Sequence, residues 1–221
     1  MLAGFRAIVE ISRMISLGQE GCKQGSTIVA RYDADWIASM LDPARRGSPP
    51  AEETIARLGV RPGQVVADVG CGPGFFTLPL ARRVWPGGRV YAIDIEPRML
   101  DIIRARAADE GLNGIETRCA AEEGIPLDSG MVDLALCGLV LHDLADRASM
   151  GAELARVVRP GGRVAVIEWM PASGEERPNR LSPEETARLL AAAGLRVEGS
   201  EPVGTRQYLV VATRGVRALR P

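Results

Sequence analysis

A group of glycines that follows a short apolar run is the first feature that could do chemistry. The run is residues 64–69 (QVVADV), and Gly70, Gly72 and Gly74 follow it in a G-x-G-x-G spacing. Glycine adopts positive φ angles and lets the backbone approach a ligand closely. Asp68 stands two residues before the first glycine. A carboxylate at that point would repel a diphosphate and would suit a cationic ligand.

The spacing of this loop differs from that of loops that bind a diphosphate. Dinucleotide-binding folds use G-x-G-x-x-G, in which the backbone approaches the pyrophosphate. S-adenosylmethionine has no phosphate and carries a sulfonium and an ammonium group, so the charge of Asp68 favours it over NAD. Cys71 lies between the first two glycines and belongs to the same loop. A tight turn that binds no ligand is the alternative interpretation.

A second carboxylate ends the next apolar run. Asp94 closes residues 91–94 (YAID), where a carboxylate can accept both ribose hydroxyls of a nucleotide cofactor. Ile95 would offer an apolar surface to the adenine. Asp94 could serve either cofactor, so it indicates a ribose without choosing between them. The alternative role is a cap for the helix expected to begin at Pro97, because aspartate is favoured at helix N-termini.

Two side chains near the ends of later strands could move a proton. His142 is the single histidine of the chain, and the ordinary pKa of histidine lies near neutral pH, which suits a general base. Glu168 lies near the end of the fifth expected strand and should face the same edge of the sheet. The alternatives are a hydrogen-bonded structural histidine and a carboxylate paired with a nearby arginine.

The elements that must position these residues alternate along the chain. Ser182 and Glu185 form a capping box for a late helix, which Gly194 ends. Residues 160–162 (PGG) are expected to end a helix before the fifth strand. The alternation predicts an α/β fold, a doubly wound and mostly parallel sheet with helices on both faces. Strand-like runs occupy residues 64–69, 89–93, 115–119, 132–138, 163–169, 196–203 and 207–213, and helical patterns occupy about 31–41, 74–84, 97–110 and 146–159.

Composition and charge exclude several classes of protein. The chain has 27 basic and 28 acidic side chains and 4% aromatic residues, which disfavours a nucleic-acid binder with a basic stripe or a stacking platform. Cys22, Cys71, Cys119 and Cys137 show no C-x-x-C spacing, and one histidine cannot complete the usual zinc sites, so no metal is expected. Free thiols fit a reducing cytoplasm. No run approaches the roughly 18 apolar residues of a membrane span.

The order of the motifs resembles one family. Four segments are similar to successive motifs of the class I S-adenosylmethionine-dependent methyltransferases. The similarity is closest to the small methyltransferase-domain group that includes the ubiquinone/menaquinone C-methyltransferases. The segments are residues 65–77 (VVADVGCGPGFFT), 90–100 (VYAIDIEPRML), 120–144 (AAEEGIPLDSGMVDLALCGLVLHDL) and 157–169 (VVRPGGRVAVIEW). The resemblance covers roughly residues 50–213, and the combined order is more specific than any single motif.

This resemblance implies a fold and a set of cofactor contacts. The fold is a seven-stranded sheet of order 3-2-1-4-5-7-6 with strand 7 antiparallel. The cofactor is S-adenosylmethionine, with its ribose held by Asp94 and its ammonium received by a main-chain carbonyl near Cys137. Ala121 stands where the family usually has an aspartate for the adenine amine, so Glu122 or a backbone group would replace it. The methionine half would be lined by the loop that contains Asp68, Gly70, Cys71, Gly72 and Gly74.

The resemblance also implies a division of the chain. Residues 48–221 would form the cofactor-binding domain, and residues 1–47 would form an N-terminal helical extension. In similar proteins that region covers the cofactor, so Tyr32, Asp33 and Trp36 would belong to a lid, or else pack against the sheet. The polar residues 171–181 form a second candidate lid.

The sequence therefore predicts a cytoplasmic methyltransferase, monomeric or homodimeric, that acts by in-line transfer on a small-molecule acceptor. In such a reaction the cofactor brings the electrophile and the protein supplies proximity and orientation. The segment after the fourth strand contains neither [DN]-P-P-[YF] nor Pro-Cys, which disfavours DNA adenine amines and cytosine C5 as acceptors. A NAD-dependent oxidoreductase and a non-catalytic nucleoside-binding module are the alternatives.

Overall fold

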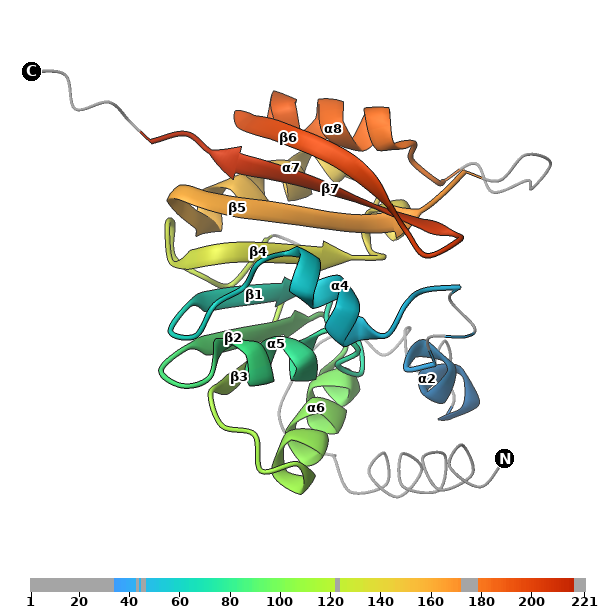
Figure 1. Ribbon diagram of the computed structural model, residues 1–221, viewed down its shortest axis with the longest axis vertical. Helices are drawn as coiled ribbons and strands as arrows, with labels where there is room; N and C mark the ends of the chain where they lie inside the picture. The colour runs from blue at the N-terminus through green and yellow to red at the C-terminus, as the bar shows by residue number, and fades with distance from the viewer. Residues whose placement is uncertain (1–33, 43, 45–46, 122–123, 172–178, 217–221) are drawn as a thin grey trace, which may run out of the picture.

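The computed structural model describes residues 34–42, 44, 47–121, 124–171 and 179–216, and its centre is a seven-stranded sheet (Figure 1). The strands lie in the order β3-β2-β1-β4-β5-β7-β6. β7 runs antiparallel to both of its neighbours, and the other neighbouring pairs are parallel. The predicted order and the single antiparallel strand are confirmed. The strands are β1 (Val65–Val69), β2 (Arg89–Asp94), β3 (Ile115–Cys119), β4 (Val132–Gly138), β5 (Val158–Trp169), β6 (Leu195–Val203) and β7 (Gln207–Arg214).

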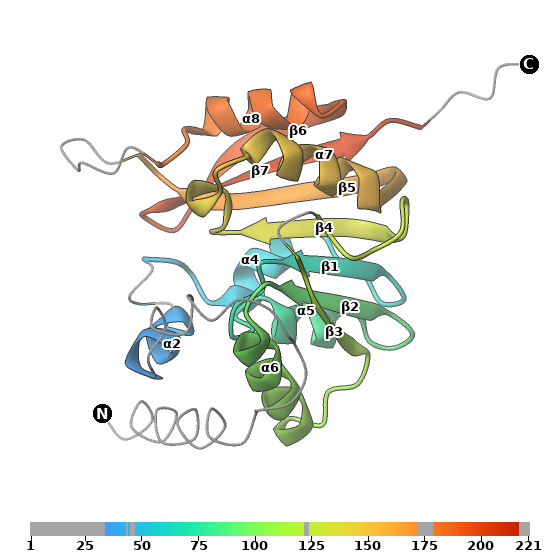
Figure 2. The same ribbon diagram turned by 180° about the vertical axis from the view of Figure 1, so that it is seen from behind.

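Helices cover both faces of the sheet. α4 (Ala51–Arg57) and α5 (Thr77–Val84) lie on the face that Figure 1 presents. α7 (Arg147–Val157) and α8 (Pro183–Ala192) lie on the opposite face, which Figure 2 shows in front. None of the described helices is long and apolar enough to cross a bilayer.

Three further helices complete the described elements. α6 (Pro97–Asp109) packs against β2 and β3, and the 3-10 turn η1 (Leu141–Asp143) follows β4. α2 (Ala34–Met40) stands off the sheet, beside the ends of β1 and β2, in both views. Ile37 of α2 is buried against Met99 and Ile102 of α6, which explains how this short helix is held there.

Local chemistry explains where two helices begin. The hydroxyl of Ser182 accepts the backbone N–H of Glu185, and the side chain of Glu185 accepts the backbone N–H of Ser182, as the predicted capping box requires. α6 begins at Pro97, and the side chain of Glu96 before it accepts the backbone N–H of Arg98. Both helices therefore satisfy some of the free N–H groups of their first turns.

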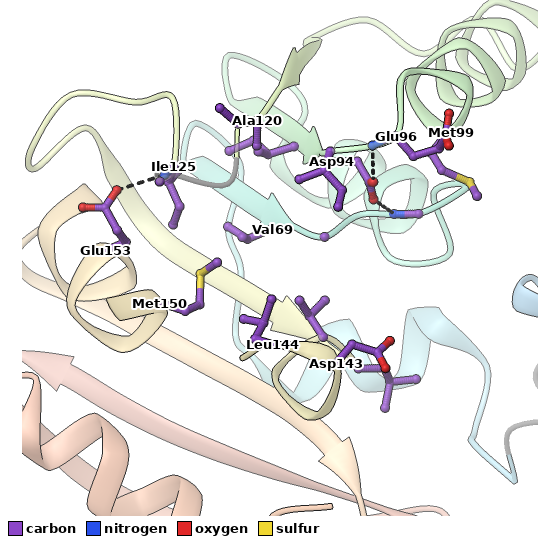
Figure 3. A pocket seen from close by; sticks show the side chains of 18 of the residues that line it. Val69, Asp94, Glu96, Met99, Ala120, Ile125, Asp143, Leu144, Met150 and Glu153 are labelled. Carbon is purple, nitrogen blue, oxygen red and sulfur yellow. Dashed lines mark hydrogen bonds between the residues drawn. The ribbon is translucent and has the colours of Figure 1, made fainter. Parts of the chain in front are cut away.

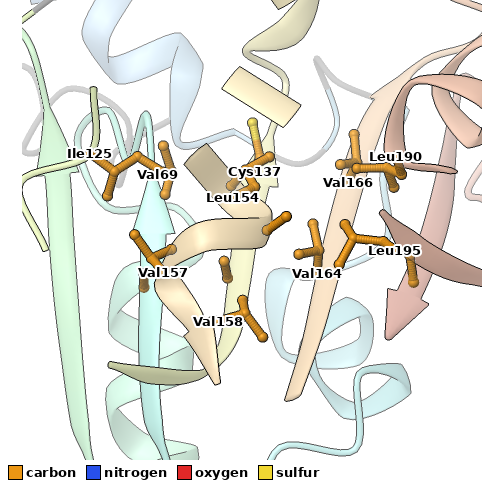
Figure 4. Close-up of a cluster of buried hydrophobic side chains, with 14 of the residues drawn as sticks. Val69, Ile125, Cys137, Leu154, Val157, Val158, Val164, Val166, Leu190 and Leu195 are labelled. Atoms are coloured by element: carbon orange, nitrogen blue, oxygen red, sulfur yellow. The ribbon is translucent and has the colours of Figure 1, made fainter. Parts of the chain in front are cut away.

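The core lies on both sides of β5. Leu154 of α7 and Leu190 of α8 are fully buried against Val164 and Val166 of β5 (Figure 4). Ile167 points to the other face, where it joins the cluster that includes α4 and α5 side chains. A strand that is buried on both faces reads as a continuous apolar run, which is the pattern of this segment of the sequence.

The fifth strand begins earlier than the sequence predicts. We expect it from residue 163, after the Pro160–Gly162 break, but β5 begins at Val158, directly after α7 ends. Val158 pairs with Val132 of β4, and the register between the two strands shifts before their next pair. The proline lacks a donor and the glycines are permissive, so this segment forms an irregularity within the ladder and does not terminate it.

The strand order creates a switch point beside β1. The chain moves from β1 to β2 and β3 and then returns to β4 on the other side of β1. In such sheets a crevice opens outside the carboxyl ends of the strands where the winding direction changes, and ligands bind there. α2 stands at this edge (Figure 1).

The predicted N-terminal extension is described only in part. Residues 1–33, Tyr32 and Asp33 among them, lie outside the described residues, as does most of the polar loop at 171–181, whereas the helix expected at about 31–41 is present as α2. The linker between α2 and α4 is tied to the turn between β6 and β7. The carbonyl of Gly47 accepts the N–H of Thr205 at 3.0 Å, and the hydroxyl of Ser48 donates to Gln207 Oε1 at 2.6 Å.

Tyr208→Phe is expected to lower the free energy of unfolding by about 1–3 kcal/mol, because buried partners lose their hydrogen bonds. Tyr208 is fully buried, its hydroxyl lies 2.7 Å from Thr186 Oγ1, and it donates to the Leu181 carbonyl at 2.9 Å. Urea denaturation measures the loss. In the double variant with Thr186→Val the penalty should be smaller than the sum of the single penalties. Strictly additive penalties would show that the two hydroxyls do not stabilise one another.

Candidate active site

A pocket of about 640 Å³ opens at the ends of β1 and β2, opposite the segment that joins β4 to α7 (Figure 3). Its volume is typical of sites for small molecules and cofactors. Figure 3 shows Asp94 and Ala120 on one wall and Leu144 and Met150 on the other. The lining residues are Met40, Val69, Gly70, Gly72, Ile93, Asp94, Ile95, Glu96, Met99, Ala120, Ala121, Gly124, Ile125, Leu139, Val140, Asp143, Leu144, Ala145, Asp146, Ser149, Met150 and Glu153.

The glycine loop after β1 folds back onto the end of β2. The N–H groups of Gly70 and Cys71 donate to the carbonyl of Ile93 at 2.8 and 3.0 Å. Gly70 has a φ of +69°, and a Cβ added there would lie 2.3 Å from a methyl group of Val140. A residue with a side chain would be strained at this position and would clash. Glycine therefore lets the two walls of the pocket approach each other.

Asp94 joins this loop to the second strand. Its Oδ2 accepts the N–H of Gly72 at 2.8 Å, and its Oδ1 accepts the N–H of Glu96 at 2.9 Å. Burial raises the pKa of the Asp94 carboxyl, although these backbone hydrogen bonds oppose the rise. Helix α6 is capped by Glu96, so the alternative role of Asp94 as its cap does not describe the structure. Asp94 lines the pocket, and each of its oxygens retains capacity for a further donor.

Asp68 is turned away from the pocket. Its side chain is 1% exposed, and its Oδ2 accepts the hydroxyl of Thr77 at 2.6 Å. Burial raises the pKa of Asp68 to about 7, with a smaller contribution from Asp94, while the Thr77 hydrogen bond lowers it. Asp68 therefore lies behind the loop, and its charge would act on a ligand through the field and not through contact.

The segment after β4 forms a wall of the pocket that the sequence did not predict. Leu139 has a φ of +61° and is the one non-glycine residue with a positive φ among those described. That conformation costs roughly 1–2 kcal/mol for an L-residue. The N–H of Leu139 donates to the Ile167 carbonyl at 2.7 Å, and both Leu139 and Val140 line the pocket. No local signal predicts this turn, because leucine does not favour left-handed backbone.

The charged residues of the pocket lining share one sign. Arg98 and Arg156 pair with two of the carboxylates, and no described arginine lines the pocket itself. A site of this sign attracts a cation and repels a diphosphate. The charged lining residues are Asp94, Glu96, Asp143, Asp146 and Glu153.

His142 and Glu168 form a hydrogen-bonded pair at the margin of the pocket. His142 Nδ1 lies 2.8 Å from Glu168 Oε2, and the backbone N–H of His142 donates to Glu168 Oε1 at 3.3 Å. Glu168 is 1% exposed. The other ring nitrogen of His142, Nε2, lies 3.6 Å from Oδ2 of Asp143, which lines the pocket. The structure thus brings both predicted catalytic residues together, although neither is itself a lining residue.

The surroundings of His142 shift its protonation toward the charged form. Burial alone lowers the pKa of His142, and Arg180 also lowers it. The hydrogen bond and the charge of Glu168, together with Asp143, outweigh both effects, so the pKa lies above the ordinary value of 6.5. A histidine held in this way by a buried carboxylate is able to take up a proton near neutral pH.

Comparison with known proteins identifies the family. Residues 67–166 match the family model described as a methyltransferase domain. An S-adenosylmethionine-dependent methyltransferase of Aquifex aeolicus is 30% identical, with a TM-score of 0.74, and the match covers 82% of this chain and 98% of that one. The chain belongs to the S-adenosylmethionine-dependent methyltransferases. The cofactor of this family is S-adenosylmethionine.

Two curated relatives match this chain over only part of their own length. The ubiquinone/menaquinone biosynthesis C-methyltransferase of Cupriavidus taiwanensis is 32% identical over 73% of this chain and 64% of its own length. The demethylmenaquinone methyltransferase of Lactococcus lactis is 33% identical over 52% of this chain and 46% of its own length. The chain therefore spans less than two thirds of either relative.

Not all residues expected to hold the methyltransferase cofactor reach the pocket. Glu122 lies outside the described residues. Cys137 is fully buried within β4, and burial raises the pKa of its thiol. The expected residues that line the pocket are Gly70, Gly72, Asp94, Ile95 and Ala121, and those that do not are Asp68, Cys71, Gly74 and Cys137.

Asp68 is expected to make stability depend on pH. The pKa of its carboxyl is about 7 in the folded protein and 3.8 ordinarily, so the unfolded chain loses this proton first as the pH rises. The free energy of unfolding should therefore fall progressively from about pH 4 to pH 7 because of Asp68, and this residue should cause no further change above pH 7. Asp68→Asn should lack this slope in urea denaturation at a series of pH values, and the exposed Asp109→Asn should retain it. An unchanged slope in Asp68→Asn would show that the buried carboxyl is already ionised.

Proposed function

We propose that this methyltransferase binds S-adenosylmethionine in the acidic pocket and transfers the methyl group to a small molecule. The charge of the pocket lining carries the proposal, because a sulfonium and an ammonium group suit a field of that sign. A net charge of −1 supports a small acceptor over a nucleic acid. The name of the Cupriavidus taiwanensis relative refers to ubiquinone/menaquinone biosynthesis and that of the Lactococcus lactis relative to demethylmenaquinone, and both names support a small-molecule acceptor.

The pocket offers a suitable partner for each part of the cofactor. Asp94 would accept the ribose hydroxyls with the capacity that its backbone hydrogen bonds leave free. Ile95 and Leu144, both in the lining, would provide apolar surface for the adenine. The backbone near Ala121, or Glu122, would receive the adenine amine. The glycine loop and a carbonyl near Cys137 would hold the methionine half.

The cofactor and the protein supply different parts of the proposed reaction. S-adenosylmethionine supplies an electrophilic methyl group on a positively charged sulfur. His142 would take the proton that the acceptor loses, and Glu168 would orient the ring and stabilise its protonated form. The electron pair left on the acceptor forms the new bond to the methyl carbon, while the pair of the broken carbon–sulfur bond remains on sulfur. The protein otherwise supplies orientation.

Two alternatives are separated by simple measurements. A NAD-dependent oxidoreductase would have to hold a diphosphate among five carboxylates, which the electrostatics oppose. A non-catalytic module would bind the nucleoside without turnover. Calorimetry with S-adenosylhomocysteine and with NADH tests the first alternative, and tight binding of NADH alone would overturn the proposal. Transfer of labelled methyl groups to the metabolites of a cell extract tests the second.

Asp94→Ala should weaken the binding of S-adenosylhomocysteine by about 1.5–3 kcal/mol, the worth of hydrogen bonds to a charged acceptor. This corresponds to roughly 10- to 150-fold in the dissociation constant, which calorimetry measures. Asp109→Ala, an exposed carboxylate at the end of α6, is the matched control and should bind normally. Circular dichroism checks that both variants are folded. An unchanged affinity in Asp94→Ala would remove this residue from the ribose site.

The protonation of His142 can be followed without any acceptor, because the chain contains a single histidine. In tag-free protein, its imidazole proton resonance should titrate with a midpoint above 6.5. Glu168→Gln should move the midpoint downward, since the raising charge is removed while burial and Arg180 remain. The exposed Glu201→Gln should leave it in place. Equal midpoints in wild type and Glu168→Gln would exclude Glu168 as the partner that prepares this base.

A further inference from the structure

The two nitrogens of the His142 ring face carboxylates in different surroundings. Nδ1 lies 2.8 Å from Oε2 of Glu168, whose side chain is buried. Nε2 lies 3.6 Å from Oδ2 of Asp143, whose side chain is 56% exposed and lines the pocket (Figure 3). The first distance is that of a hydrogen bond, and the second is too long for one. Within the described part of the chain, the ring is therefore hydrogen-bonded through Nδ1 and not through Nε2.

The pairing with Glu168 decides which ring nitrogen can act as the base. A carboxylate accepts hydrogen bonds, so Nδ1 carries the proton of the neutral ring and Nε2 keeps its lone pair. The backbone N–H of His142 donates to Oε1 of Glu168 at 3.3 Å, which ties the carboxylate to the same turn. Nε2 is thus the atom of the ring that is able to take up a proton.

Asp143 is placed to respond to that proton. Its carboxylate and the lone pair of Nε2 are both hydrogen-bond acceptors, so they repel each other while the ring is neutral. Once Nε2 carries a proton, the same two groups form an ion pair with a donor between them. The turn η1 fixes this arrangement, because His142 and Asp143 are neighbours in it and the N–H of Asp143 donates to the Val140 carbonyl at 3.0 Å.

Asp143 differs from the other carboxylates of the pocket lining in its hydrogen bonds. Its side chain accepts none from a described residue, and its ion-pair partner among those residues is the His142 ring. Asp143 can therefore turn toward Nε2 without breaking another contact. The remaining lining carboxylates are occupied: Asp94 by the N–H groups of Gly72 and Glu96, Glu96 by Arg98, Asp146 by the N–H of Ser149, and Glu153 by Arg156 and the N–H of Ile125.

Charged side chains from several elements surround His142 within the described ranges. Glu168 comes from β5, Asp143 from η1 itself, and Arg180 from the segment before α8. Arg147 of α7 reaches the backbone carbonyl of His142 at 3.4 Å. Burial and the charge of Arg180 lower the pKa of the imidazole, and the two carboxylates outweigh both effects. Asp143 is the exposed member of this pair of carboxylates, and Glu168 is the buried one.

We propose that Asp143 is a positioning residue for the base: it binds the protonated His142 ring through the Nε2–H group and leaves the neutral ring to the acceptor. This inference rests on the proposed methyltransferase function and adds the residue that stabilises the product of its proton transfer. Because the contact between Asp143 and Nε2–H forms as the proton arrives, it stabilises the transition state more than the ground state.

The proton transfer balances as follows on the chain's own atoms. The bond between the acceptor atom and its proton breaks, and the proton forms a bond with the lone pair of Nε2. The electron pair left on the acceptor forms the bond to the methyl carbon. The Nε2–H group then donates to Oδ2 of Asp143. Water at this exposed carboxylate removes the proton, and Nε2 regains its lone pair for the next turnover.

The test follows the imidazole by NMR in the tag-free full chain with isotope-labelled histidine, since the chain contains one histidine. At a pH above the titration midpoint, the nitrogen shifts should show a neutral ring that is protonated on Nδ1. Asp143→Asn keeps the shape of the side chain and removes its charge. The midpoint should therefore fall by about half a pH unit, the scale expected for one unit charge at this separation near water.

Two further variants separate the charge of Asp143 from its shape and from the general field of the pocket. Asp143→Glu keeps the charge and changes the shape, so its midpoint should stay closer to that of the wild type than the midpoint of Asp143→Asn does. Asp146→Asn is the matched control, because Asp146 also lines the pocket and asparagine also caps a helix. Its midpoint should stay close to that of the wild type.

Three results of these NMR measurements would overturn the inference. The first is a neutral ring protonated on Nε2, and the second is an equal midpoint in wild type and Asp143→Asn. The third is a larger fall of the midpoint in Asp143→Glu than in Asp143→Asn, which would show that shape and not charge matters at this position.

The transfer of labelled methyl groups to the metabolites of a cell extract gives a second readout. The base acts in its neutral form, so the rate should rise with pH through the midpoint of His142, and Asp143→Asn should move this rise to lower pH. A rate that falls equally at every pH would show a structural role and contradict the inference. Absence of any transfer by the wild type would refute the proposed function, while the NMR midpoints would still decide whether Asp143 pairs with the protonated ring.

Discussion

The hydrogen bond from the Gly72 N–H to Asp94 Oδ2 is the contact on which the site depends. It joins the loop after β1 to the end of β2, two parallel neighbours whose carboxyl ends meet at the switch point. In a diphosphate-binding loop the backbone approaches the ligand's phosphates. Here the donor is used by a carboxylate of the protein itself. The loop of the proposed cofactor site therefore differs from a diphosphate-binding loop in how this backbone donor is used.

The charge of the pocket lining is the feature that bears on which nucleotide cofactor fits it. The loop after β1 and the acid after β2 are compatible with two classes of nucleotide cofactor. The negative sign shared by the charged lining residues distinguishes them, since it attracts a cationic cofactor and repels a diphosphate of like charge at short range.

The expectation for Asp68 shows where local reasoning reaches its limit. Its position two residues before Gly70 correctly marks the end of a strand that faces the switch point. The direction of its side chain depends on Thr77, nine residues away, whose hydroxyl donates a hydrogen bond to it behind the loop. Because that contact requires the loop to be folded already, spacing alone could not separate a ligand-facing carboxylate from a buried one. Asp94 has the same chemistry but does line the pocket.

The sequence by itself determined the succession of strands and helices, the capping box at Ser182 and the position of Asp94 at the end of a strand. These features depend on periodicity, glycine and proline chemistry and short-range hydrogen bonds, all of which neighbouring residues encode. The tertiary structure decided the left-handed turn at Leu139, the approach of Met40 to the pocket and the pairing of His142 with Glu168. Those depend on which strands become neighbours and on where side chains point once the sheet has closed, and no local pattern contains that information.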